Sequence, residues 1–100
     1  MHADRVFDAL ASGARRQLLR ELAQSARTTS ELAARLGISM PAVSRHLSVL
    51  ENAGLATSHR HGQRVLYGLV RDTLIEALSA FAAELAPAEP ARPRKPREAI

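Results

Sequence analysis

The sequence has 100 residues, of which 46% are hydrophobic, enough for one domain with a compact core. Lysine and arginine outnumber aspartate and glutamate by 14 to 10, and the resulting net charge of +4 favours a nucleic-acid partner. Cysteine is absent, which excludes disulfides, thiolate metal sites and thiol redox sensing. No apolar run approaches the about 20 residues of a membrane helix, and no apolar signal core follows the N-terminus. We therefore expect a soluble cytoplasmic protein.

Two helices are predicted before residue 26. Val6, Phe7 and Leu10 recur at helical spacing and predict a short helix from about residue 4 to residue 11. The pair Ser12-Gly13 interrupts it. A second helix then ends near residues 24–25, with leucines facing inward and arginines facing outward. The leucines are Leu18, Leu19 and Leu22, and the arginines are Arg15, Arg16 and Arg20.

The next segment predicts a helix-turn-helix. Residues 28–31 (TTSE) form a capping box that begins a helix of about two turns, and Gly37 ends this helix in a left-handed cap. Ser39 caps the following helix, a proline lies in its first turn, and residues 52–54 end it. In such an arrangement, here spanning residues 30–53, the second helix enters the DNA major groove.

The hydrophobic period changes from helical to alternating after Gly54. Residues 55–59 and 64–69 predict two short strands, joined as a hairpin through a turn at Gly62. A last helix is predicted from Asp72, as its N-cap, to about residue 86.

Four prolines follow, so we expect residues 87–100 to be a disordered tail rich in proline and arginine. Residues 1–86 form the folded domain. The predicted fold class is mainly α with a small β-hairpin, a winged helix-turn-helix in the order helix, helix, helix, helix, strand, strand, helix.

The outer face of the helix after Ser39 carries the predicted base contacts. With Val43, Leu47 and Leu50 facing inward, the outer face holds small residues and Arg45, which can pair with guanine or clasp a phosphate. Two apolar side chains suit a thymine methyl group, and His46 can donate to a phosphate. The candidates for DNA contact are Ser39, Met40, Pro41, Ala42, Ser44, Arg45, His46 and Ser48. The alternative is an ordinary amphipathic helix with a solvated face.

The tip of the hairpin supplies a second group of candidates around Gly62. Basic side chains on such a wing can lie on the DNA backbone or in the minor groove. The alternative is a solvated turn. The residues are His59, Arg60, His61, Gln63 and Arg64.

The histidines raise the hypothesis of a metal site. His59 and His61 share one strand face, and Asp72 and Glu76 lie one turn apart on the last helix. Zinc takes three or four ligands, so we predict no metal and assign the two histidines to DNA. Glycines occur singly, and no serine is paired with a histidine and an acid, so no enzyme is predicted.

The apolar stripe of the last helix, together with the first helix, predicts a seam between two copies of the chain. The alternative is that the stripe is core. A dimer would place two recognition helices about 34–36 Å apart, which matches a palindromic operator. The predicted seam residues are Val6, Phe7, Leu10, Leu74, Ile75, Leu78, Phe81, Ala82 and Leu85.

Several segments together resemble the ArsR-type winged-helix repressors over about residues 4–85. They are Leu10–Leu19, Ser30–Ala33, Pro41–Leu47, Leu50–Leu55 and Tyr67–Leu69, and the most specific part is Ser44–Leu47.

This resemblance implies a homodimer, built from the first and last helices, that binds a palindrome and blocks transcription. It also implies a small-molecule or protein inducer, not identified by the sequence, that lowers DNA affinity. Metal-sensing members carry cysteines near the helix matching residues 30–36, or acid and histidine pairs on the last helix. Asp72 and Glu76 have no histidine beside them here, so the chain resembles a member without these sites, with no cofactor.

Two other functions stay open. One is a metal-responsive repressor with an atypical site at His59, His61 or His2. The other is a winged-helix protein-interaction module that does not bind DNA.

Overall fold

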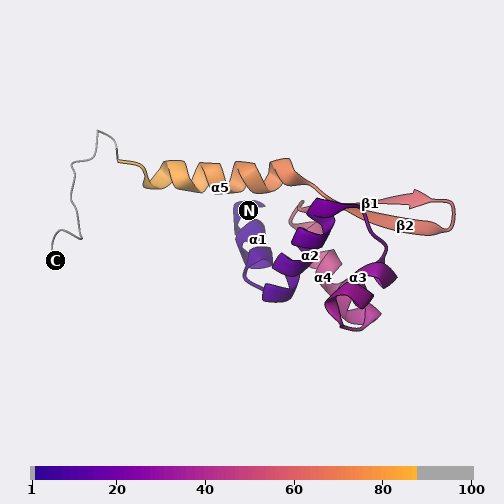
Figure 1. Cartoon of the computed structure of the whole chain (residues 1–100). Helices are drawn as coiled ribbons and strands as arrows, with labels where there is room; N and C mark the ends of the chain where they lie inside the picture. The colour runs from indigo at the N-terminus through magenta and orange to yellow at the C-terminus, as the bar shows by residue number, and fades with distance from the viewer. Residues whose placement is uncertain (1, 88–100) are drawn as a thin grey trace.

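The computed structural model describes residues 2–87. Its elements follow the predicted order, and the arrangement is a winged helix-turn-helix (Figure 1). The segment predicted to be a disordered tail lies, apart from Pro87, outside the described residues. The elements are α1 (His2–Leu10), α2 (Gly13–Gln24), α3 (Thr29–Leu36), α4 (Met40–Asn52), β1 (Ala56–His61), β2 (Arg64–Leu69) and α5 (Arg71–Leu85).

The boundaries of three predicted elements are wrong by one or a few residues. Helix α1 begins before residue 4, and β1 starts one residue later than predicted and continues to His61. Helix α5 begins at Arg71, so Asp72 lies inside its first turn and is not its cap. Val70 occupies the cap position, and its N–H donates to the carbonyl of Leu55 at 2.9 Å. The strand pairing therefore continues up to the start of α5.

The predicted caps of the helix-turn-helix are confirmed. Thr28 and Glu31 form the capping box of α3, because each side chain accepts the backbone N–H of the other residue. Gly37 ends α3 with φ of 71°, a left-handed conformation that glycine adopts without a Cβ clash. Ser39 accepts the N–H of Ala42 at 3.2 Å and fixes the start of α4. Local chemistry thus sets the length of the turn between α3 and α4.

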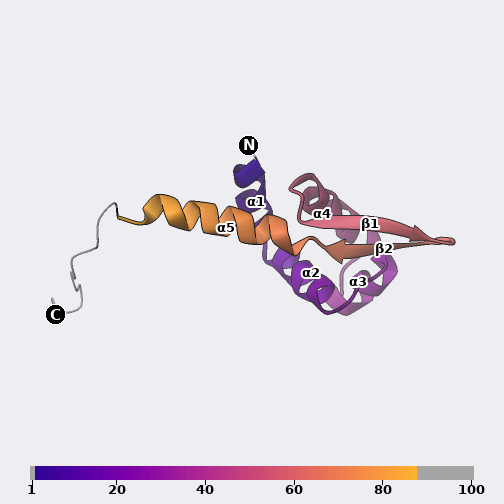
Figure 2. The ribbon, with the colours of Figure 1, turned by 90° about the horizontal axis from the view of Figure 1, so that it is seen from above.

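The core lies where α1–α4 meet the base of the hairpin (Figures 1 and 2). It consists of aliphatic side chains, and only three residues of the sequence are aromatic. The largest fully buried side chains are Leu18, Leu32, Leu47, Leu50, Leu55, Val6 and Val43. Among the described residues, no helix is long and apolar enough to cross a membrane.

Two arginines at the start of α2 hold the end of α1, although the sequence pattern placed them outward. The Arg15 guanidinium donates to the carbonyls of Ala9 (2.8 Å) and Asp8 (3.0 Å), and Arg16 donates to that of Leu10 (2.7 Å). The last carbonyls of a helix have no partner inside the helix, so these contacts satisfy them. Arg15 is half-buried as a result, and α1 is fixed against α2.

The hairpin and α5 extend from this helical body in opposite directions in both views (Figures 1 and 2). Helix α5 contacts α1 but has no buried residue along its 15-residue length. The protomer thus has two extensions, a basic hairpin and an apolar helix.

Candidate nucleic-acid interface

The outer face of α4 is exposed as the helical period predicts. Val43, Leu47 and Leu50 lie in the core, and Arg45 therefore points to solvent. Met40, at the N-terminal end of the helix, is 49% exposed, so its side chain is accessible to a partner. Of the other predicted contact residues on α4, Ser39, Pro41, Ser44 and Ser48 are exposed, and Ala42 and His46 are half-buried.

All five predicted contact residues of the hairpin are exposed. The pairing of His59 with Leu66 and of His61 with Arg64 places these four side chains on one face. Val65 and Tyr67 lie on the opposite face, and Tyr67 packs against the core. Gly62 has φ of 63° and permits the tight turn between the strands. The hairpin therefore presents His59, His61 and Arg64 together.

A short backbone pairing holds the hairpin against the helix-turn-helix. Arg27, just before α3, exchanges two hydrogen bonds with Tyr67 of β2, with N···O distances of 3.0 and 2.8 Å. The side chain of Arg27 also contacts Glu21, which contacts Arg35 of α3 as well. A two-stranded hairpin is marginally stable alone. The backbone pairing of Arg27 with Tyr67 adds a short third segment beside β2 and fixes the base of the hairpin.

An ion pair adds a second link between the hairpin and α3. The Glu31 carboxylate uses Oε1 to accept the Thr28 N–H at 2.8 Å, and its Oε2 lies 3.4 Å from Nη2 of Arg64. The hydrogen bond from Thr28 is the main cause that lowers the pKa of Glu31, and the charge of Arg64 lowers it further. Sequence reasoning found the capping box and missed the contact with Arg64, which lies 33 residues away.

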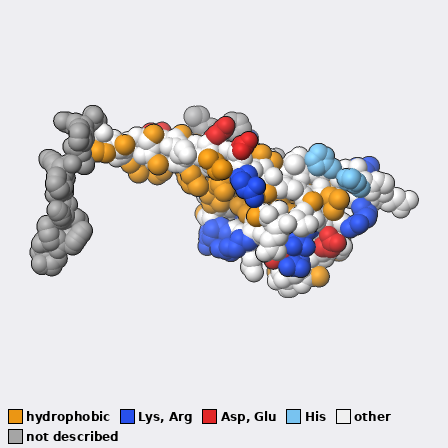
Figure 3. Space-filling model, turned by 45° about the horizontal axis from the view of Figure 1, so that its top comes forward, with side chains coloured by type: hydrophobic (Ala, Val, Ile, Leu, Met, Phe, Trp, Pro, Cys, Tyr) orange, Lys and Arg blue, Asp and Glu red, His pale blue; other side chains and the backbone are white. Residues whose placement is uncertain are grey.

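Glu31 and Arg64 line one surface hollow with Met40 and Gln63, at the point where α3, α4 and the hairpin meet. Figure 3 shows arginine and histidine side chains along the hairpin end of the molecule. We call the 13 predicted DNA-contact residues of α4, its cap and the hairpin the reading surface.

His46 is joined to α2 by a contact that the sequence did not predict. Nη1 of Arg15 lies 3.4 Å from Nδ1 of His46, and burial, then the charges of Arg15 and Arg45, lower the pKa of this imidazole. A neutral ring that accepts at Nδ1 carries its proton on Nε2. His46 therefore keeps a neutral N–H donor beside Arg45.

The predicted seam is largely an exposed apolar face in the protomer. Four large side chains of α5 are about half exposed or more, whereas Leu10 and Leu74 are half-buried against the core. Val6 is wrong as a seam residue: it is 1% exposed and fills the core, so it has no surface to offer a partner. Ala82 is also exposed. The four large side chains are Ile75, Leu78, Phe81 and Leu85.

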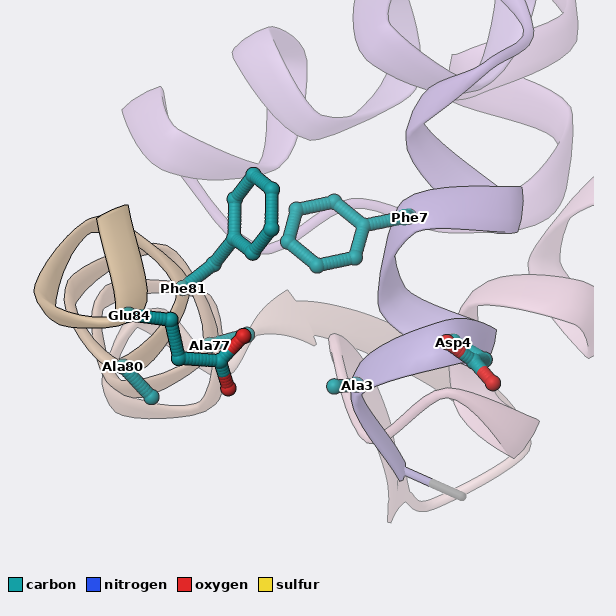
Figure 4. Close-up of a pocket in the computed structure, with 7 residues that line it drawn as sticks. All are labelled: Ala3, Asp4, Phe7, Ala77, Ala80, Phe81 and Glu84. Atoms are coloured by element: carbon teal, nitrogen blue, oxygen red, sulfur yellow. The ribbon is translucent and has the colours of Figure 1, made fainter.

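Phe7 of α1 and Phe81 of α5 pack edge to face with ring centroids 5.4 Å apart. Figure 4 shows the two rings pointing toward each other between the helices, above Ala77 and with Asp4 and Glu84 at the rim. This pair fixes α5 against α1. The two helices therefore form one surface.

Within residues 2–87, no group of three or more His, Cys, Asp or Glu side chains lies close enough to hold a metal ion. His59 and His61 share a face, as predicted, but Leu66 and Arg64 are their cross-strand partners.

Comparison with known proteins identifies similar sequences. The family model described as "Bacterial regulatory protein, arsR family" matches residues 12–58. An HTH-type transcriptional regulator of Mycobacterium tuberculosis is 44% identical over 66 residues, which cover 66% of this chain and 62% of that protein. The chain thus spans less than two thirds of that relative. The transcriptional repressor SdpR of Bacillus subtilis is 32% identical over 74 residues, which cover 74% of this chain and 82% of SdpR.

Solved structures agree with the fold. A homodimeric winged helix-turn-helix DNA-binding domain from Mycobacterium bovis matches with a TM-score of 0.70 and 30% identity. The match covers 83% of this chain and 78% of that domain.

The lowered pKa of His46 predicts a pH dependence of stability. The unfolded chain, in which the pKa is near 6.5, binds more protons than the folded chain below that value. The free energy of unfolding should therefore fall as the pH drops from about 7.5 to about 5.5. Urea unfolding at fixed protein concentration measures this. The variant His46→Asn, whose side-chain oxygen can still accept from Arg15, should lose less stability over this range, and an unchanged pH dependence would contradict the assignment.

Proposed function

Because the chain belongs to the arsR family of bacterial regulatory proteins, which are not enzymes, we propose that it is a DNA-binding transcriptional repressor. We further propose that it acts in the cytoplasm as a homodimer on a palindromic operator. The observation that carries this proposal is the reading surface: the exposed N-terminal half of α4 and the basic hairpin lie next to each other around one hollow.

The two parts of the reading surface suit different parts of DNA. The N-terminal half of α4 carries small side chains beside Arg45, which allows the helix backbone to approach base edges. Arg45 suits guanine, and Met40 and Ala42 suit a thymine methyl group. The arginines and histidines of the hairpin suit phosphates or the minor groove, and these contacts add affinity without reading sequence.

The apolar face of α5 supports the proposed homodimer. Large exposed apolar side chains in a row mark an interaction site, and the similar domain from Mycobacterium bovis is homodimeric. A two-fold dimer presents two reading surfaces in opposite directions, so its natural target is a palindrome with half-sites about one helical turn apart.

We propose that DNA binding needs no metal cofactor, which the absence of cysteine from the sequence supports. An inducer of the small-molecule or protein class would act by favouring a dimer geometry that fits DNA less well. DNA binding measured in the presence of a metal chelator tests directly whether a metal is needed.

Selection from a pool of random duplexes with the purified chain identifies the preferred sequence. On this duplex, Arg45→Ala should cost about 1–3 kcal/mol and relax the preference at one base pair, because a bidentate contact is lost. Arg20→Ala is the matched control, since Arg20 is exposed on α2 outside the reading surface. Equal affinity of Arg45→Ala and the parent would show that Arg45 does not read DNA.

The dimer is tested by placing a charge on the face of α5. Leu78→Glu should give a folded monomer, because Leu78 is 46% exposed in the protomer and a buried carboxylate at the seam is costly. Ala83→Glu, which adds the same charge on the opposite side of α5, should remain a dimer. Sedimentation equilibrium distinguishes the two states, and a dimeric Leu78→Glu would refute this seam.

A further inference from the structure

Glu31 brings a negative charge to the hollow between the start of α4 and the hairpin, next to side chains that are suited to DNA. It lines the hollow shared by Met40, Gln63 and Arg64, and it is the one acidic side chain among the described residues of that hollow. A phosphate backbone is repelled by a carboxylate at this position. The charge also suits the N-terminus of α3, since the hydrogen bond from Thr28 is the main cause of the lowered pKa of Glu31, so a test must separate an effect on DNA from the role in the cap.

The contact of Glu31 with Arg64 is long and exposed to solvent. The N···O distance of 3.4 Å is long for a charged pair, and the two side chains are 47% and 61% exposed. Exposed pairs of this kind are weak, and a phosphate is a competing partner for the guanidinium. Oε1, in contrast, stays engaged with Thr28 at 2.8 Å, so the carboxylate itself is held in place.

We propose that Glu31 is a positioning residue that restrains Arg64 in the free protein and thereby limits the affinity of the chain for DNA of any sequence. Before Arg64 binds a DNA phosphate, that phosphate must displace the Glu31 carboxylate from the guanidinium. The inference rests on the proposed function, because it concerns the affinity of the same reading surface.

The test uses Glu31→Gln, which removes the charge while the amide oxygen can still accept the Thr28 N–H. On a short duplex of mixed sequence, affinity should rise about two- to fivefold for each protomer in contact with the DNA. The decrease of log affinity with log salt should become steeper, by up to about one unit per protomer. A purely structural role in the cap would lower thermal stability and leave this slope unchanged.

Two controls separate the role of Glu31 from a general change of charge. Glu76→Gln makes the same charge change on the exposed surface of α5 and should leave both affinity and slope near those of the parent. In an Arg64→Gln background, the effect of Glu31→Gln should largely disappear, because it acts through Arg64.

The outcomes distinguish this inference from the proposed function. If the parent binds no duplex, the proposed function fails and the inference fails with it. If the parent binds DNA and Glu31→Gln binds no more tightly, or gains equally in the Arg64→Gln background, only the inference is overturned.

Discussion

The burial of Val43, Leu47 and Leu50 in the core is the constraint on which the reading surface depends. These three side chains are at most 1% exposed, so they fix the rotation of α4 about its own axis. A shift of one residue would turn the helix by about 100° and bring Arg45 toward the core. Because Ser39 and Gly37 also fix where α4 begins, the packing of a few aliphatic side chains decides which residues face a partner.

The hairpin and α5 depend on contacts outside this core. Tyr67 pairs with Arg27 through the backbone, and Glu31 adds a weaker contact to Arg64, so the base of the hairpin is fixed more firmly than its tip. Helix α5 is held against α1 by the packing of Phe81 on Phe7, and Ile75, Leu78 and Leu85 stay exposed on its apolar face. In a chain of 100 residues the core leaves some apolar side chains exposed, and the second copy that we propose would cover those of α5.

Much of the fold was predictable because it is encoded locally. Capping residues, a glycine cap and two hydrophobic periods placed the helix-turn-helix and the hairpin within a few residues. Contacts between distant elements were not predictable. Arg15, expected to face outward, reaches α1 and His46, and Arg64, expected to contact DNA, also reaches Glu31. Val6 was assigned to the seam because periodicity marks an apolar face and does not say which side of α1 meets the core.

The most direct test of the account is a residue-by-residue map of the DNA contact. Backbone amide signals of the isotope-labelled chain are followed by NMR while a duplex enriched from a random pool is added. The account predicts the largest changes in the N-terminal half of α4 and in the hairpin around Gly62, with the end of α5 little affected. Changes concentrated on α5 and α1, with α4 unaffected, would contradict the claim that α4 and the hairpin form one DNA-reading surface.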